Sequence, residues 1–363
     1  MSIVLENLCH KVNGKTRIHD VNLVLEPGSF NVLLGKKGGK KAGKTTLMRL
    51  IAGLESSSSG RILKNGVDLT NVPVQQRNVS MVHHQFINYP HLTVRDNIAS
   101  PLRVIGLKKS EIELKVNEIA ALLHIESCLD RYPLELSGGQ QQRTAMARAL
   151  VKDADIILLD EPLVNLDYKL REELRTEIRD LLAARNCTAI YATTNPKVAM
   201  ALGGKSILMH EGRVIQEGEA SVVYNQPINV DAAKLCSDPE MNLLEGSITD
   251  NEIIFHNTLR YPLNSQIAEL APGDYRFGIR PSHLKFVPAD DRDLELSMRV
   301  DLAEISGSES MIRLSNKHFS LVMHLAGVHE YHTDAQIKVY MPIHKIFVFG
   351  TNDLLIKAPV LTY

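Results

Sequence analysis

The chain has 363 residues, more than a single hydrophobic core usually supports, so we expect two domains. Apolar residues make up 44% and charged residues 23% of it, as in ordinary globular proteins, and the formal net charge is −1. This balance excludes a strong overall attraction to nucleic acid or to anionic lipid.

We expect neither a membrane span nor a secretory leader. No uncharged apolar run approaches the ~20 residues that span a bilayer, and the N-terminus lacks the basic and apolar regions of a leader. The four cysteines are isolated in sequence, which favours free thiols in a reducing compartment. His83 and His84 point to opposite faces of a strand, so we expect no metal between them.

The first elements indicate a hairpin followed by a strand, a loop and a helix. Residues 3–8 and 21–25 alternate apolar and polar side chains, and Asn13-Gly14 marks a turn between them. Residues 30–34 form a short apolar run, and residues 45–54 have helical periodicity. The loop between these two is rich in glycine and lysine, and phosphate-binding loops have this order of elements.

The central part of the chain alternates helices and apolar strands. Residues 92–136 are largely helical, a helix opens at 140–150, and residues 170–184 form an amphipathic helix. Residues 156–159 and 189–193 are apolar runs typical of buried parallel strands. This alternation predicts an α/β domain with a mostly parallel sheet.

The pattern changes near residues 227–239. From residue 243 onward, alternating stretches separated by turn residues predict short strands at 252–255, 275–279, 311–314, 319–324 and 336–340. We therefore expect a second, all-β domain of about 120 residues, barrel-like or OB-like.

The glycine- and lysine-rich loop satisfies the pattern of a phosphate-binding loop. In such loops, backbone N–H groups surround phosphate oxygens, the lysine reaches the β- and γ-phosphates, and the next hydroxyl binds Mg²⁺. Lys44 and Thr45 would take these two roles. The candidate nucleotide-binding residues are Gly38, Gly39, Lys40, Lys41, Ala42, Gly43, Lys44, Thr45 and Thr46.

Two carboxylates, Asp160 and Glu161, directly follow the apolar strand at 156–159. This position fits an aspartate that holds Mg²⁺ through water and a glutamate that acts as general base on the attacking water. We expect Thr45 and Asp160 at the metal and Glu161 as the catalytic residue. Two acidic residues that merely begin a loop are the simpler interpretation, and the buried apolar strand before them argues against it.

The stretch Leu136-Ser137-Gly138-Gly139-Gln140, followed by that strand and its carboxylates, resembles the signature of ABC transporter ATP-binding subunits. The resemblance implies ATP and Mg²⁺, and it places each ATP between the phosphate loop of one subunit and the signature of another. The signature residues would present N–H groups to the partner's γ-phosphate. They are Ser137, Gly138, Gly139 and Gln140. Asp167 resembles the aspartate of the D-loop, which crosses the dimer interface.

Parts of the ATP site depart from that family's pattern. The phosphate loop is longer than usual in the family. His84 occupies the position of the family's metal-contacting glutamine, and Gln85 lies one residue after that position. Thr194 stands where the family has a switch histidine, and Val12 where an aromatic ring stacks on adenine. Threonine is too short to link the γ-phosphate to the catalytic glutamate as imidazole does. These departures predict a degenerate ATP site and favour a heterodimer with a second ATPase.

Finer features resemble one branch of the family. Residues 241–246 and 278–284 resemble the regulatory domain of carbohydrate-importer ATPases, which include the maltose and glycerol-phosphate systems. Four further stretches resemble an ATP-binding subunit of the bacterial glycerol importer: residues 85–90, 97–101, 167–175 and 191–194. The resemblance implies a subunit that energises import of a carbohydrate or polyol, with glycerol favoured.

We therefore expect an ABC nucleotide-binding domain over residues 1–235, with a helical subdomain at about 86–145, and a β-rich, OB-like (TOBE-like) regulatory domain over 236–363. The chain would act at the cytoplasmic face of the bacterial inner membrane as a peripheral subunit. Its expected direct partners are transmembrane permease subunits, which would contact residues 84–98. A periplasmic solute-binding protein would be an indirect partner.

Two alternatives stay open. The first is a nucleotide-binding regulatory module that does not hydrolyse ATP and binds other proteins. The second is an ABC ATPase that acts on nucleic acid. It fits less well, because such proteins usually fuse two cassettes, whereas this chain has one and no basic surplus. We expect no nucleic-acid partner.

Overall fold

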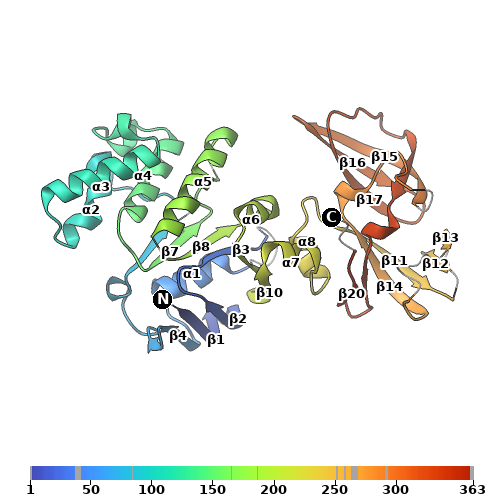
Figure 1. Cartoon of the computed structure of the whole chain (residues 1–363), viewed down its shortest axis with the longest axis horizontal. Coiled ribbons are helices and arrows are strands. Elements are labelled where there is room, and N and C mark those ends of the chain that lie inside the picture. Colours follow the sequence, from blue (N-terminus) through green and yellow to red (C-terminus); the bar gives the residue numbers. More distant parts are fainter. Residues whose placement is uncertain are drawn as a thin grey trace. The chain divides into compact units, whose positions relative to one another are not determined.

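Figure 1 shows a computed structural model of the chain, which describes residues 2–36, 42–83, 85–164, 166–185, 187–250, 252–256, 259–262, 269–290 and 293–359. The chain divides into two compact units, Met1–Ala220 and Ser221–Tyr363. This boundary falls earlier than the expected one at 235/236. The difference arises because helix α8 (Val230–Leu235) buries Val230 and Ala233 in one cluster with Phe347 and Phe349 of the second unit.

The first unit contains two sheets. A four-stranded antiparallel sheet has the order β2-β1-β4-β5, and a six-stranded sheet has the order β10-β9-β3-β8-β7-β6. The strands are β1 (Ile3–Val12), β2 (Lys15–Leu25), β3 (Phe30–Leu34), β4 (Ser59–Lys64), β5 (Val67–Asp68), β6 (Val79–Val82), β7 (Ile156–Asp160), β8 (Thr188–Thr193), β9 (Lys205–His210) and β10 (Arg213–Glu219). In the six-stranded sheet all neighbours are parallel except β10, which runs antiparallel to β9. The predicted α/β domain with a mostly parallel sheet is confirmed.

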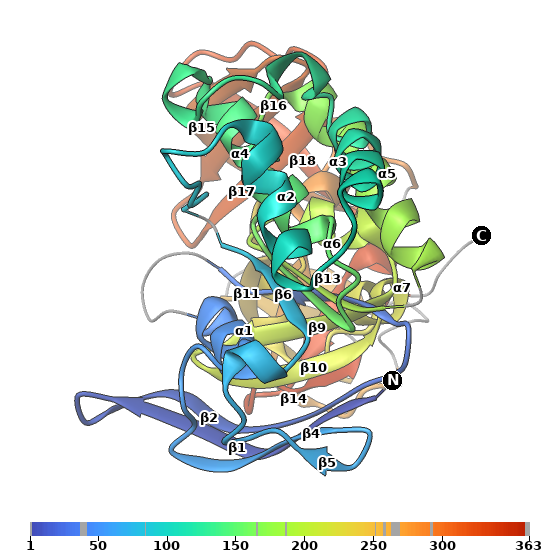
Figure 2. The ribbon, with the colours of Figure 1, turned by 90° about the vertical axis from the view of Figure 1, so that its left-hand side faces the viewer.

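The central strands are apolar because helices and the second sheet cover both faces of the parallel sheet. Every residue of β7 and of β8 is buried, which explains why residues 156–159 and 189–192 within them are apolar runs with no polar alternation. The hairpin of β1 and β2 turns at Asn13 and Gly14, as predicted, and Asn13 has a φ of 49° there. Figure 2 shows the four-stranded sheet below α1, away from α2 and α3.

The helices of the first unit are α1 (Lys44–Ala52), α2 (Val94–Val104), α3 (Lys109–Leu122), α4 (Gly138–Leu150), α5 (Tyr168–Ala184) and α6 (Pro196–Leu202). Helices α2, α3 and α4 pack on one another and lie together in Figure 1. Helices α2 and α3 lie within residues 86–145, the segment expected to form a helical subdomain, and α4 extends beyond it to Leu150. Helix α5 buries Leu174, Ile178 and Leu182, which lie on the apolar face predicted from its periodicity.

The described part of the second unit is all-β apart from the short helices α7 (Ala220–Asn225), which begins at the boundary, and α8, and two 3₁₀ turns at Pro281–His283 and Ile343–Lys345. Its strands are β11 (Asn242–Ile248), β12 (Glu252–Phe255), β13 (Leu259–Pro262), β14 (Gly273–Ile279), β15 (Leu294–Ser306), β16 (Glu309–Ser315), β17 (Ser320–Ala326), β18 (Gln336–Met341), β19 (Phe347–Phe349) and β20 (Leu355–Lys357). They form two antiparallel sheets in the orders β13-β12-β11-β14-β19-β20 and β17-β16-β15-β18. One buried cluster joins them, with Leu244 and Phe277 from the first sheet and Val300 and Ile312 from the second.

A buried arginine ties the first residues of the second unit to its sheets. Arg280 is 2% exposed, donates to Ser237 Oγ at 2.8 Å, and lies 3.6 Å from the centre of the Tyr224 ring. Its guanidinium also donates to the carbonyl oxygens of Tyr224 and Cys236. Removing it leaves these acceptors without a donor in a buried place.

Arg280→Met is therefore expected to lower the free energy of unfolding by about 3 kcal/mol, because buried hydrogen bonds from a charged group are lost. Chemical denaturation of the full chain, followed by circular dichroism, measures this change. Arg260→Met is the matched control, since Arg260 forms an exposed ion pair with Glu252 and should cost less than about 1 kcal/mol. Equal effects of the two substitutions would contradict a stabilising role for Arg280.

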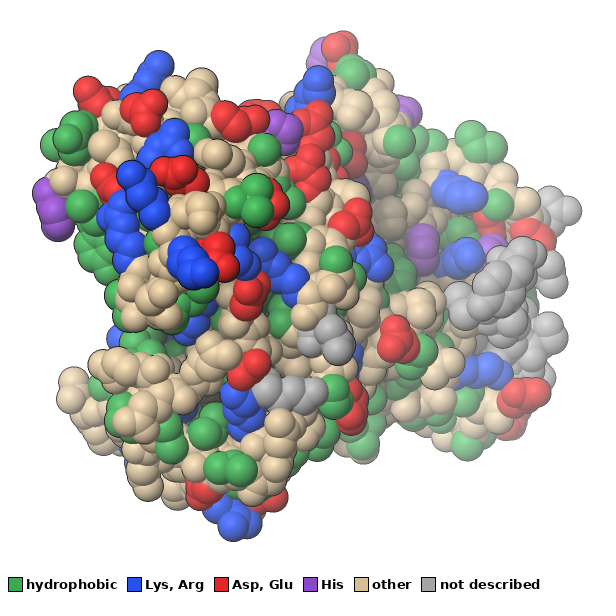
Figure 3. All heavy atoms as spheres, turned by 60° about the vertical axis from the view of Figure 1, so that its left-hand side comes forward, with side chains coloured by type: hydrophobic (Ala, Val, Ile, Leu, Met, Phe, Trp, Pro, Cys, Tyr) green, Lys and Arg blue, Asp and Glu red, His purple; other side chains and the backbone are tan. Residues whose placement is uncertain are grey.

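Two surface properties bear on the function. No helix in the described ranges has both the length and the hydropathy needed to cross a membrane. On the face shown in Figure 3, basic and acidic side chains are intermixed over the first unit, in agreement with the net charge of −1. The described side chains of that face form no continuous basic surface for a polyanion.

Candidate active site

The phosphate-binding loop joins β3 to α1. Four of its predicted residues, Gly38, Gly39, Lys40 and Lys41, lie outside the described residues, and so does the expansion of the loop. The end of the loop is described. Gly43 has a φ of 96°, which favours glycine, and an added Cβ would lie 2.9 Å from Ile18 Cδ1. The N–H of Gly212 donates to the carbonyl oxygen of Ala42 at 3.0 Å, so the loop end is held against the β9–β10 turn.

Helix α1 begins with the two residues assigned to phosphate and metal. Lys44 is 7% exposed, and its Nζ donates to the carbonyl oxygen of Gly35 at 2.5 Å, across the base of the loop. Thr45 Oγ1 donates to Asp160 Oδ2 at 2.7 Å. Thr46 follows on the same helix and is half-buried. The ammonium group, the hydroxyl and the carboxylate therefore meet at the carboxyl ends of β3 and β7.

The residues present fit a Mg²⁺ ion that is bound with a phosphate. Mg²⁺ is usually held by one or two protein oxygens, with water and substrate phosphates completing its octahedral shell. Thr45 and Asp160 supply two such oxygens, and Asp160 is 2% exposed at the end of a buried strand. No cluster of three or more His, Cys, Asp or Glu occurs among the described residues, so these side chains match a shared protein–phosphate site better than a closed metal cage.

Glu161 leaves the strand in an unusual backbone conformation. Its φ is 49°, and its N–H donates to the carbonyl oxygen of Ala192 in β8 at 3.1 Å. Such a conformation in a residue other than glycine is uncommon and is often found at functional sites. The side chain lines a hollow of about 190 Å³ together with Thr194, so the structure brings together the predicted base and the residue that replaces the switch histidine.

The same hollow contains basic and polar residues that the sequence did not single out. Arg171 and Arg175 of α5 line it, and so does Tyr191 of β8. Burial raises the pKa of the Tyr191 phenol above its ordinary value, so it stays a hydrogen-bond donor. Arg171 also donates to the carbonyl oxygen of Leu166 at 2.5 Å. The periodicity of α5 indicates a helix but does not show that its first turns line the same hollow as Glu161.

Two further residues, His84 and Gln85, are predicted to lie near the nucleotide. His84 lies outside the described residues. Gln85 is exposed, its N–H donates to His83 Nδ1 at 3.3 Å, and it is not among the residues that line the hollow. Val12, in the place of an adenine-stacking ring, is exposed at the end of β1.

The signature sequence forms the start of α4. Ser137 caps the helix, its Oγ accepting from Gln140 N at 3.3 Å while Gln140 Oε1 accepts from Ser137 N at 3.0 Å. Ser137 and Gly138 are exposed, and a Cβ at Gly138 would meet no heavy atom within 4 Å. The open N-terminus of this helix can receive an anion, because its first N–H groups have no partner within the helix.

Asp167 caps helix α5. Its Oδ1 accepts from Leu170 N at 3.0 Å, and its side chain is exposed. In the loop before this cap, Leu163 and Val164 line the hollow, and Leu166 lies close to Gly139 at the start of α4. Asn165 in this loop lies outside the described residues.

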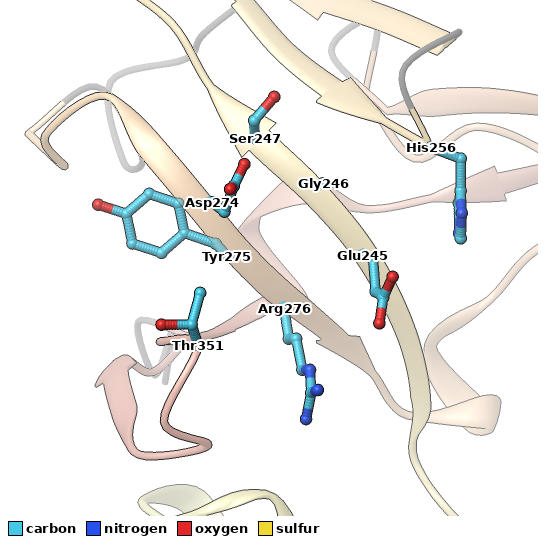
Figure 4. Close-up of a pocket in the computed structure, with 8 residues that line it drawn as sticks. All are labelled: Glu245, Gly246, Ser247, His256, Asp274, Tyr275, Arg276 and Thr351. Carbon is cyan, nitrogen blue, oxygen red and sulfur yellow. The ribbon is translucent and has the colours of Figure 1, made fainter.

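A separate hollow of about 410 Å³ lies in the second unit and includes none of the predicted ATP-site residues. Glu245 of β11 and Arg276 of β14 are partners in the strand register, as are Ser247 and Asp274. Figure 4 shows these side chains along the two neighbouring strands. Arg276 also pairs with Asp353.

Comparisons with known proteins identify the family. A family model described as ABC transporter matches residues 18–164. The uncharacterized ABC transporter ATP-binding protein YcjV of Escherichia coli O6:H1 is 35% identical over 92% of this chain and 93% of its own length. The chain belongs to the ABC transporter ATP-binding proteins. It is therefore an ATP-binding, ATP-hydrolysing protein, and the resemblance inferred from its motifs is confirmed.

Further relatives of this ABC protein include import subunits. The sn-glycerol-3-phosphate import ATP-binding protein UgpC of Psychromonas ingrahamii is 36% identical over 83% of this chain and 78% of that protein. The protein of the same name from Paraburkholderia xenovorans is 33% identical over 96% of this chain and 97% of that protein. The solved structure of the ATP-binding cassette MJ0796, a dimer bound to ADP and Pi, is 26% identical with a TM-score of 0.55 and covers 60% of this chain and 98% of its own.

Proposed function

We propose that this ABC protein is the ATP-hydrolysing subunit of an importer for a sugar- or polyol-class solute, with glycerol and sn-glycerol 3-phosphate as the leading candidates. The observation that carries the ATPase role is the contact of Thr45 with Asp160, which lies beside Lys44 and directly before Glu161. The solute class rests on the import relatives and on the sequence features of the carbohydrate-importer branch. The chain would associate with the membrane through permease subunits.

In the proposed mechanism, Lys44 binds the β- and γ-phosphates. Thr45 and Asp160 are the residues that would hold Mg²⁺, and the ion would supply positive charge to the phosphate oxygens. Glu161 accepts a proton from a water molecule, whose oxygen attacks the γ-phosphorus. The bond between the γ-phosphorus and the β–γ bridging oxygen breaks, and ADP and phosphate result. The exposed N-terminus of α4, beginning at Ser137, would bind the γ-phosphate of the other subunit's ATP.

We take a dimer as the working assembly. The heterodimer with a second ATPase, which the sequence favoured, has no support in the comparisons, and the matched MJ0796 structures are described as dimers of one cassette. Two copies of this chain can supply two composite sites by the two-fold symmetry of a closed dimer. Thr194 would make both sites slow, because each lacks an imidazole near Glu161.

Thr194→His is expected to raise kcat for ATP hydrolysis about tenfold, because an imidazole in the hollow beside Glu161 can bridge the carboxylate and the γ-phosphate. Steady-state hydrolysis by the purified chain measures the change, with the double variant Thr194→His, Glu161→Gln as the control that should stay inactive. An unchanged or lower kcat for the single variant would contradict the view that Thr194 limits the site.

Transport itself is tested with the chain and its permease subunits in lipid vesicles. We expect a solute-binding protein loaded with glycerol 3-phosphate or glycerol to stimulate hydrolysis and to drive uptake of the labelled solute. A disaccharide such as maltose serves as the comparison within the wider solute class. If no polyol or sugar stimulates hydrolysis or enters the vesicles, the importer proposal fails, and a regulatory module becomes the better account.

A further inference from the structure

A buried glutamine joins the signature helix to the catalytic loop of the same chain. Gln142 lies in α4 and is 0% exposed. Its Nε2 donates to the carbonyl oxygen of Pro162, the residue that directly follows Glu161. Its Oε1 is buried and has no hydrogen-bond partner in the described part of the chain. A buried polar group with an unsatisfied acceptor is costly, so a position of this kind calls for a functional explanation.

The same loop also lies close to the same helix at a second position. A Cβ at Gly139 would lie 3.2 Å from Leu166 Cδ2, and Leu166 is buried. Arg171 holds the Leu166 carbonyl oxygen from the side of α5. The loop that follows Glu161 is thus hydrogen-bonded to α4 at Pro162 and lies beside the first turn of α4 at Leu166.

We propose that Gln142 is a positioning residue that couples the signature helix to the general base within one chain. A small shift of α4 toward an anion at its N-terminus pulls on the Pro162 carbonyl through Gln142. Because Pro162 follows Glu161 directly, the shift also turns the carboxylate. Binding of the partner's ATP at Ser137 and Gly138 thereby sets the geometry of this chain's own catalytic group. The inference rests on the proposed roles of Glu161 and of the signature sequence.

The coupling depends on the amide donor and not on packing alone. Methionine has nearly the volume of glutamine and fills the same space, but it cannot donate to Pro162. Glutamate keeps the shape of the glutamine side chain, but an oxygen replaces the amide nitrogen that donates to Pro162. Its carboxylate repels the Pro162 carbonyl, whereas its protonated form can donate, and burial raises the pKa of a glutamate placed there.

The test compares Gln142→Met and Gln142→Glu with Thr144→Val in the full-length chain. Thr144 is the matched control: it is also 0% exposed in α4, but its Oγ1 donates to Gln140 O within the helix. We expect Gln142→Met to lower kcat about tenfold. Its affinity for ATP, measured without Mg²⁺, and the midpoint of its thermal unfolding should stay close to those of Thr144→Val. For Gln142→Glu, kcat relative to wild type should rise as the pH falls from about 8 to about 6.

A second readout does not need hydrolysis. Hydrogen exchange is followed before and after addition of a non-hydrolysable ATP analogue with Mg²⁺. In the wild type, the backbone around Glu161 and the first turn of α4 should both exchange more slowly when the analogue binds. In Gln142→Met, only the first turn of α4 should exchange more slowly. Joint protection in both proteins, or equal losses of kcat in the Met and Val variants, would overturn the coupling. If Glu161→Gln leaves hydrolysis intact, the proposed catalytic role of Glu161 fails. The hydrogen-exchange data then still show whether Gln142 couples α4 to the loop after Glu161.

Discussion

Glu161→Gln is expected to lower kcat for ATP hydrolysis about 10²- to 10⁴-fold and to leave ATP binding intact, because the amide keeps the shape but cannot accept the proton of the attacking water. Glu161 begins the loop after β7, next to Asp160 and on the hollow shared with Thr194. Binding of a fluorescent ATP analogue and release of phosphate are measured on the same preparation.

Glu118→Gln is the matched control for this change of charge. Glu118 is exposed on α3, away from the carboxyl ends of the central strands, and hydrolysis should stay within about twofold of wild type. Should Glu161→Gln hydrolyse ATP as fast as the wild type, another group must activate the water. Should the wild type itself bind ATP and release no phosphate, the chain would be the regulatory module considered as the alternative.

Ser137→Arg is expected to lower hydrolysis about 10²-fold as well, but through the partner's site, because a large cationic side chain blocks the open N-terminus of α4 where the γ-phosphate should bind. The capping bonds with Gln140 are lost at the same time, so circular dichroism must show that the helix content is unchanged. Measurements of ATP affinity should show little change, since the phosphate loop is untouched.

Mixing the two inactive variants distinguishes the possible assemblies. In a dimer of this chain, a Ser137→Arg copy keeps its own Glu161, and a Glu161→Gln copy keeps its own signature. Each mixed dimer then has one composite site with both Glu161 and an open signature, so random pairing should restore at most about a quarter of wild-type activity. The coupling through Gln142 lowers this recovery, because the copy that keeps Glu161 has a blocked signature of its own. No recovery would show that the two sites are not shared between copies. Recovery only after addition of a different ATPase would support the heterodimer that the sequence favoured.

The architecture of the first unit could be predicted because its signals are local. The apolar run of β7, the helical periodicity of α5 and the turn at Asn13 and Gly14 each depend on a few neighbouring residues. The motifs likewise specified ATP chemistry, since the lysine, hydroxyl and carboxylates stand at set distances from strand ends. The sequence contains no signal for a division of the chain after Ala220, because the burial of α8 against Phe347 and Phe349 depends on contacts between residues far apart in sequence.

The sequence by itself therefore determined the family, the order of helices and strands, and the types of residue at the ATP site. Only the tertiary structure showed that Thr45 donates to Asp160 across 115 positions of sequence, that Arg171 and Tyr191 share a hollow with Glu161, and that Gln142 binds the Pro162 carbonyl. The physical reason is that periodicity reveals which face of an element is buried, but not which distant group it meets. Those partners are set by the packing of parallel strands and the helices that cover them.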